Sequence, residues 1–492
     1  MVVRPSSRRA NPDLALTVLV FLGLFAWFWA IQRGEFVSYD GRIMAGVARN
    51  LWEHGSLRPF GDSFGTGMRL HWAPYGIAMS LLMSPLWALQ LDRDPHGAFW
   101  LTFVGPILTA LTGALLYRIG RTLGWRRTTA VIVPVAFGIL TMAAVYSTEL
   151  FSEPAVTLGT VIVVLGLLRW RDDATIGPWL VGGGIAFTIL ARFDSVVLVL
   201  PVLIVVPLFV PLTRLRATWR RWLPALAIPL ALALGWTLYY NNLRFGSPFD
   251  GGYQDDLFTF GFFDGIGRQL LSPGKGFFWY DAILIAALPG FVWLWRRDRG
   301  TTVAVAGLSL ARVLFFASWY TPDGFVAWGP RFLVPACALL AIPLGETIEW
   351  VHRRGTVARR VAFGVIGSLA LVSAVVTVVS LWLPYDYSWT VVNAIPHYQE
   401  LPGATVDRLR VERLDAMNNT WEHSPINLGL RSLAHPRAGT PFPLRWWRGG
   451  PSPTGVLAVL LAGGCLGLAG LVAHKARGGG AERTPTTKQS IG

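Results

Sequence analysis

The residue that most directly suggests chemistry is Asp40, which lies a few positions after the first long apolar stretch, residues 14–31. A carboxylate just outside the bilayer can act as a general base on a lipid-linked substrate. A helix-like segment follows and stops near Gly55, so Asp40 also fits the N-cap of an interfacial helix, a position that aspartate favours. The two roles are compatible, because a capping carboxylate can still present its second oxygen to a substrate.

Other charged residues gather at predicted membrane boundaries. Glu149 and Glu153 are four positions apart, so they could share one face of a helix. Arg192 and Asp194 occupy a very short link between two apolar runs, where they either close a turn as an ion pair or contact a substrate. Acidic groups at such a boundary are also candidate oxygen ligands for a divalent metal, and Asp40 belongs with the two glutamates in that set.

Three more cations, Arg244, Lys275 and Arg331, are candidates to bind an anion. Lys275 lies between two glycines, which let backbone N–H groups and the ammonium approach an anion closely. The segment lacks the frame of a Walker loop, so we exclude an ATPase. Arg331 follows Trp328, and this pair fits either a cationic site or anchoring at the membrane interface.

The composition indicates a polytopic membrane protein. Of 492 residues, 53% are hydrophobic and 14% are charged, with a mean hydropathy of +0.47, whereas soluble proteins have roughly 25% charged residues. Apolar runs long enough to cross about 30 Å of hydrocarbon predict an all-α fold with about twelve transmembrane helices. The approximate spans are 14–31, 98–117, 129–146, 155–168, 177–191, 196–212, 223–240, 280–295, 301–318, 332–350, 361–383 and 454–473.

The net charge of +15 reflects topology and excludes a nucleic-acid partner, because the arginines cluster in short loops on one side of the predicted spans. This is the positive-inside pattern. It predicts a multi-pass protein of the plasma (inner) membrane with cytoplasmic N- and C-termini. The clusters are Arg118–Arg127, Arg214–Arg221, Arg296–Arg299 and Arg353–Arg360.

The large loops, residues 32–97, 241–279 and 384–453, are expected on the outer side. Residues 74–91 are apolar, but a span there would invert every later arginine cluster, and two prolines interrupt it. We therefore predict interfacial or re-entrant helices in the first outer loop, which protein contacts would shelter. Residues 351–473 form the C-terminal spans with the third loop, and the polar tail, residues 474–492, is expected to be disordered.

Three stretches resemble the GT-C superfamily of integral-membrane glycosyltransferases, most closely its polyprenyl-phosphate-sugar-dependent, family 39-like bacterial branch. They are residues 39–55, residues 240–277 and residues 328–332. The likeness spans roughly residues 14–350, and we expect residues 1–350 to form a catalytic transmembrane module with the outer loops 32–97 and 241–279. Two departures stand out: Gly41 follows Asp40 where many members have glutamate, and His71-Trp72-Ala73-Pro74 replaces the Lys-Pro-Pro of lipid A-modifying members.

The resemblance implies an inverting glycosyltransferase of cell-envelope biogenesis, which moves a hexosyl or pentosyl group at the outer membrane face. The sugar would pass from a polyprenyl-phosphate donor, among membrane lipids, to a glycan, lipid or protein acceptor. Asp40 would deprotonate the acceptor, and fixed cations would stabilise the leaving phosphate. The alternatives are a flippase or transporter, which usually shows internal repeats that we do not find, and a polymerase or ligase of lipid-linked saccharides. The substrate-binding candidates are His71, Glu149, Glu153, Arg192, Asp194, Arg244, Lys275 and Arg331.

Overall fold

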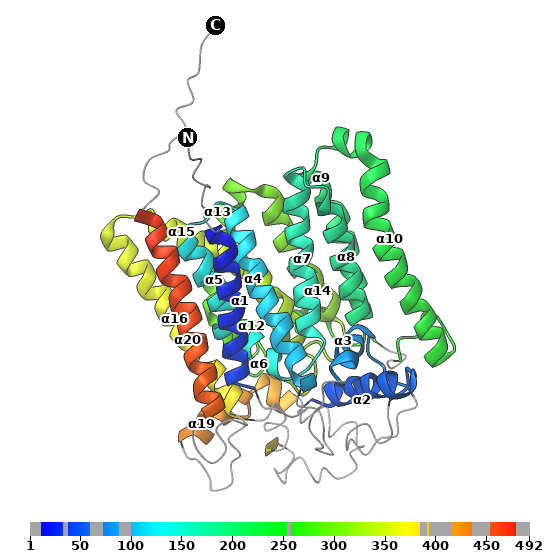
Figure 1. Cartoon of the computed structure of the whole chain (residues 1–492). Coiled ribbons are helices and arrows are strands. Elements are labelled where there is room, and N and C mark those ends of the chain that lie inside the picture. The colour runs from blue at the N-terminus through cyan, green and yellow to red at the C-terminus, as the bar shows by residue number, and fades with distance from the viewer. Residues whose placement is uncertain are drawn as a thin grey trace.

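The computed structural model describes residues 11–32, 38–59, 72–87, 100–252, 257–383, 391–392, 415–434 and 453–478. These residues form a bundle of roughly parallel and antiparallel helices without strands (Figure 1). In the described part of the chain, eight helices are long and apolar enough to cross a membrane, and four shorter apolar helices accompany them. The expected all-α polytopic membrane fold is therefore confirmed.

Neighbouring long helices of the bundle pack against one another. α7 packs against α8, and α1 packs against α4 and α20. The bundle helices are α1 (Pro12–Ala30), α4 (Val104–Thr122), α5 (Arg127–Leu140), α7 (Glu153–Arg171), α8 (Ile176–Ala191), α9 (Val199–Phe209), α10 (Leu212–Phe245), α14 (Arg299–Ala317), α15 (Val334–His352), α16 (Thr356–Trp382) and α20 (Pro453–Gly478).

Shorter helices fill the ends of the bundle and the breaks between its long helices. The α-helices are α2 (Tyr39–His54), α3 (Ala78–Trp87), α6 (Ala143–Thr148), α11 (Phe262–Leu270), α12 (Phe277–Tyr280), α13 (Gly290–Arg297) and α19 (Pro425–Ala434). The 3₁₀ segments are η1 (Trp100–Phe103), η2 (Phe193–Leu198), η3 (Ala282–Ala287) and η4 (Arg331–Leu333).

The contact between α7 and α8 depends on glycine. A Cβ added to Gly159 would lie 2.9 Å from the carbonyl oxygen of Gly184, closer than real side chains come to backbone atoms. Small residues of this kind let two membrane helices approach closely, and packing then replaces the hydrophobic effect that lipid does not supply. The close approach of Gly159 and Gly184 holds α8 against α7. The chain continues from the end of α8 directly into Arg192.

The prediction of one continuous span over residues 280–295 is wrong. The chain there forms α12, η3 and α13 in succession. Asp281 separates the first two, and its carboxylate accepts a hydrogen bond of 2.7 Å from the backbone N–H of Met142. Pro289, which has no N–H to donate, precedes α13. A buried carboxylate and a proline thus interrupt an apolar run that is otherwise long enough to cross the membrane.

α2 lies across the direction of the bundle at one end, with α3 beside it (Figure 1). Its N-cap is Ser38, whose hydroxyl accepts from the backbone N–H of Gly41 at 3.0 Å. The interpretation of Asp40 as the N-cap is therefore wrong, because Asp40 is already inside the first helical turn. Gly55 ends the helix with φ 65°, as predicted. Residues 74–87 contain only the ten-residue α3 rather than a continuous span.

The connections between α9 and α10 and between α15 and α16 lie at the end opposite α2, together with α13 (Figure 1). The first residues of α1 and the last residues of α20 lie at that end too. Three of the predicted arginine clusters lie in or beside these segments, at residues 214–221, 296–299 and 353–360. The end that holds α2 is called the α2 end below.

Candidate functional site

Asp40 presents a largely buried carboxylate at the α2 end, with 17% of its side chain exposed. The hydroxyl of Tyr75 donates to Oδ1 at 2.8 Å, and Nη1 of Arg331 donates to Oδ2 at 3.1 Å. Tyr75 comes from the segment just before α3, and Arg331 begins η4. Both carboxylate oxygens are thus held by groups from distant parts of the chain, which fixes their orientation.

Arg331 is itself held from several sides. Its guanidinium lies 4.9 Å from the ring centre of Phe151 and 5.2 Å from that of Phe332. Its Nε is 3.9 Å from Oε1 of Glu153. Gly324 makes room for it: a Cβ at Gly324, where φ is 84°, would lie 2.4 Å from Cγ of Arg331. The aromatic faces favour the planar cation and restrict its movement.

Arg192 joins two acidic residues in one network. It donates to Oε1 of Glu153 at 3.1 Å, and its Nε and Nη2 donate to Oδ2 of Asp194 at 2.9 and 2.6 Å. The ion pair, one of the two alternatives for this short link, is present. The guanidinium also lies 4.8 Å from the ring centre of Phe332. Arg192 and Arg331 therefore share both Glu153 and Phe332.

Arg312 completes what we call the arginine cluster, Arg192, Arg312 and Arg331. It is fully buried in α14, and its Nε donates to the carbonyl oxygen of Phe332 at 3.0 Å. The side chain turns into the protein and does not reach towards the membrane surface. Its Nη1 and Nη2 have no hydrogen-bond partner among the described residues, and buried guanidinium donors of this kind fit an anionic ligand.

Glu149 and Glu153 do not share a helical face. Glu149 follows the last residue of α6, whereas Glu153 begins α7, and Leu150 between them has φ 42°. Both glutamates are buried. Within the described ranges no group of three or more His, Cys, Asp and Glu side chains could hold a metal ion. Glu153 faces the guanidinium groups of Arg192 and Arg331.

Arg244 contacts backbone rather than Asp40. It donates to the carbonyl oxygens of Ala73 and Tyr75 and to Oδ1 of Asn241, and its guanidinium lies 3.9 Å from the ring centre of Tyr240. These contacts tie the end of α10 to the segment that carries Tyr75. Arg244 thereby fixes the residue that orients Asp40.

Lys275 is fully buried, and its ammonium donates to the carbonyl oxygens of Phe325, Ala327 and Gly329. Burial lowers the pKa of Lys275 from 10.5 to about 8. The lysine thus holds the loop that leads to Arg331. His71 lies outside the residues that the structure describes.

The sequence did not reveal two features of this site. Tyr75 lies in the predicted re-entrant segment, but nothing in its local sequence indicates a hydrogen bond to Asp40. Trp328 is not an interfacial anchor, because it is only 2% exposed. Its carbonyl oxygen accepts a hydrogen bond of 2.7 Å from the hydroxyl of Tyr146, which fixes the turn before Arg331.

No protein-family model matches the sequence, and no curated protein matches it significantly. Solved structures do resemble it. ArnT from Cupriavidus metallidurans, crystallised with undecaprenyl phosphate, is 14% identical with a TM-score of 0.52, over 94% of this chain and 78% of that chain. The apo oligosaccharyltransferase of Archaeoglobus fulgidus is 13% identical with a TM-score of 0.45, over 86% of this chain and 61% of that one. The likeness to ArnT shows that the two chains share a fold.

Proposed function

We propose that this protein is an inverting glycosyltransferase that transfers a sugar from a polyprenyl-phosphate donor to a cell-envelope acceptor. The observation that carries the proposal is the oriented carboxylate of Asp40 beside the arginine cluster at the α2 end. A base and a set of fixed cations are the two parts that this reaction needs. The fold it shares with ArnT, whose structure holds undecaprenyl phosphate, supports the class of donor.

Asp40 acts as the general base in this proposal. It takes the proton of the acceptor hydroxyl, and the oxygen attacks the anomeric carbon from the face opposite the phosphate. The new glycosidic bond forms as the bond between the anomeric carbon and the phosphate oxygen breaks, so the anomeric configuration inverts. Tyr75 and Arg331 hold the carboxylate in line, and a positioned base of this kind contributes roughly 10²- to 10⁴-fold.

The arginine cluster stabilises the leaving polyprenyl phosphate. Arg312 carries guanidinium nitrogens that have no protein hydrogen-bond partner in the described residues, and Arg192 and Arg331 bring further positive charge next to Phe332. Preorganised cations in a site of low dielectric constant stabilise developing negative charge more strongly than they would in water. Glu153 and Asp194 keep the guanidinium groups in place before the donor binds.

The test is Asp40→Asn in full-length protein with a polyprenyl-phosphate sugar and an acceptor preparation. We expect donor turnover to fall by about 10³-fold while the variant keeps its thermal stability, because asparagine retains hydrogen bonds to Arg331 and Tyr75. Asp250→Asn is the matched control, since Asp250 lies in an exposed turn. Full transfer by Asp40→Asn would refute the role of the base. Translocation of donor across liposomes without any transfer would favour the flippase.

A further inference from the structure

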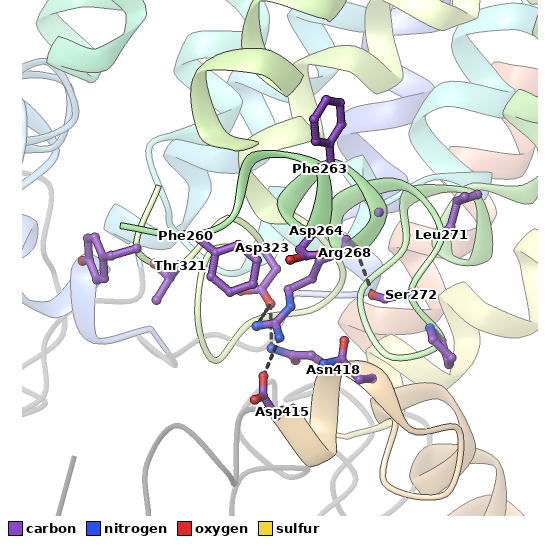
Figure 2. A pocket seen from close by; sticks show the side chains of 14 residues that line it. Phe260, Phe263, Asp264, Arg268, Leu271, Ser272, Thr321, Asp323, Asp415 and Asn418 are labelled. Carbon is purple, nitrogen blue, oxygen red and sulfur yellow. Dashed lines mark hydrogen bonds and ion pairs between the residues drawn. The ribbon is translucent and has the colours of Figure 1, made fainter. Parts of the chain in front are cut away.

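A cavity with a volume of about 690 Å³ opens at the α2 end. It is lined by α11, by the loop that follows α14, and by a short helix at residues 415–419 (Figure 2). This volume lies within the roughly 300–1,000 Å³ that small-ligand sites occupy. None of the residues of the arginine cluster lines it, so the cavity is separate from the proposed donor phosphate site.

Polar side chains from three segments converge in this cavity (Figure 2). Arg268 of α11 pairs with Asp415 and lies 3.9 Å from Asp323, and Asn418 donates to Asp323 at 2.6 Å. The amide oxygen of Asn418 has no hydrogen-bond partner among the described residues, although the side chain is only 1% exposed. Leaving a buried acceptor unpaired is costly, so this atom indicates that a donor group comes from a ligand.

The charges of the lining define the chemistry of that ligand. Asp264, Asp323 and Asp415 bring carboxylates, against the single guanidinium of Arg268. Such a balance repels phosphate and other anions. Carboxylate and amide oxygens accept hydrogen bonds from hydroxyl groups, and the guanidinium and amide N–H groups can donate to them. The lining therefore fits a neutral ligand rich in hydroxyl groups.

We infer that this cavity binds the acceptor, and that the acceptor is a neutral glycan. The inference rests on the proposed function and adds the class of the second substrate. Asp323, in the cavity wall, accepts from the backbone N–H of Phe325, and Gly324 between them lies against the side chain of Arg331. Arg331 in turn donates to Asp40, the proposed base. A glycan in the cavity therefore lies beside the loop that contacts Arg331.

The test measures glycan binding without any donor. Full-length protein in lipid nanodiscs is titrated by calorimetry with maltotriose, cellotriose and mannotriose, and with trilysine as a cationic peptide. We expect at least one trisaccharide to bind and Asp264→Ala to weaken that binding about tenfold, the loss of one hydrogen bond to a charged group. Glu422→Ala is the matched control, because Glu422 is likewise exposed and acidic but does not line the cavity.

A second pair of variants tests the apolar rim. Phe263 lines the cavity and is 83% exposed, whereas Phe249 is 79% exposed and lies elsewhere. Phe263→Ala is expected to weaken trisaccharide binding about fivefold, and Phe249→Ala to leave it unchanged. Tighter binding of trilysine, no trisaccharide binding, or equal effects of each variant and its control would overturn the assignment. Trisaccharide binding by a protein that turns over no donor would support the cavity and refute the proposed transfer.

Discussion

Arg331 donates to Asp40 across 3.1 Å, although 291 positions separate the two residues in the chain. The pair joins the start of α2 to the start of η4, so both segments contribute to the proposed active site. Arg331 also approaches Glu153 and lies against two aromatic rings. The guanidinium is therefore oriented by its surroundings before any substrate binds.

The geometry of Arg331 predicts that its charge alone is insufficient. Arg331→Lys keeps the cation but loses the planar guanidinium, which donates to Asp40 through Nη1 and packs on Phe151 and Phe332. We expect donor turnover to fall by about 10²-fold, measured as release of polyprenyl phosphate. Arg216→Lys, at an exposed position in α10, should leave turnover unchanged. Wild-type turnover by Arg331→Lys would show that the planar guanidinium does not matter.

Tyr75 offers a test confined to one atom. Tyr75→Phe removes only the hydroxyl that donates to Oδ1 of Asp40 at 2.8 Å. One such hydrogen bond contributes about 1 kcal/mol, so we expect turnover to fall about fivefold with little change in the melting temperature. Tyr239→Phe serves as the control because Tyr239 is 58% exposed. The prediction fails if both variants behave alike.

Gly41 occupies a position with no room for a side chain. A Cβ at this position would lie 2.7 Å from Oγ of Ser38 and 2.8 Å from the carbonyl oxygen of Leu150. Gly41→Glu, which restores the pattern of many members, should therefore disturb the first turn of α2 and abolish turnover. Even Gly41→Ala should cost about 1–3 kcal/mol of stability. Gly183→Ala in α8 has open space at its Cβ and should be neutral by thermal unfolding.

Lys275 predicts an unusual dependence of stability on pH. Its pKa is about 8 in the folded protein against 10.5 for an ordinary lysine, because burial disfavours the charged form. Between these values the unfolded chain binds more protons, so this group makes unfolding harder as pH rises from 8 to 10.5. The gain is on the order of 3 kcal/mol. The melting temperature of the wild type should therefore rise relative to that of Lys275→Met over this window.

The comparison is made in one detergent at pH 7.5, 9 and 10.5, and the difference between the two proteins is the quantity of interest. Subtracting the variant removes the pH dependence that other groups contribute. A constant difference across the three pH values would mean that Lys275 keeps its ordinary affinity for a proton in the folded state.

Apolar length and charge placement determined most of the architecture, because helices are what satisfy a backbone within lipid. Residues 14–31, for example, became α1, and Gly55 ended α2 as predicted. The prediction of a continuous helix over residues 280–295 failed, because a hydrogen bond between Asp281 and Met142 accompanies the break in the helix. Such a partner cannot be read from a local pattern.

For the site, the sequence by itself determined which residues were worth attention: Asp40, Glu153, Arg192 and Arg331 all lie near the ends of apolar segments. Only the tertiary structure decided how they pair, because ion pairs and ring contacts between distant segments depend on how helices pack. It separated Arg244 and Lys275, which hold backbone carbonyls, from Arg331, which meets Asp40. It also supplied Tyr75, whose role depends on a contact between two segments that no spacing in the sequence encodes.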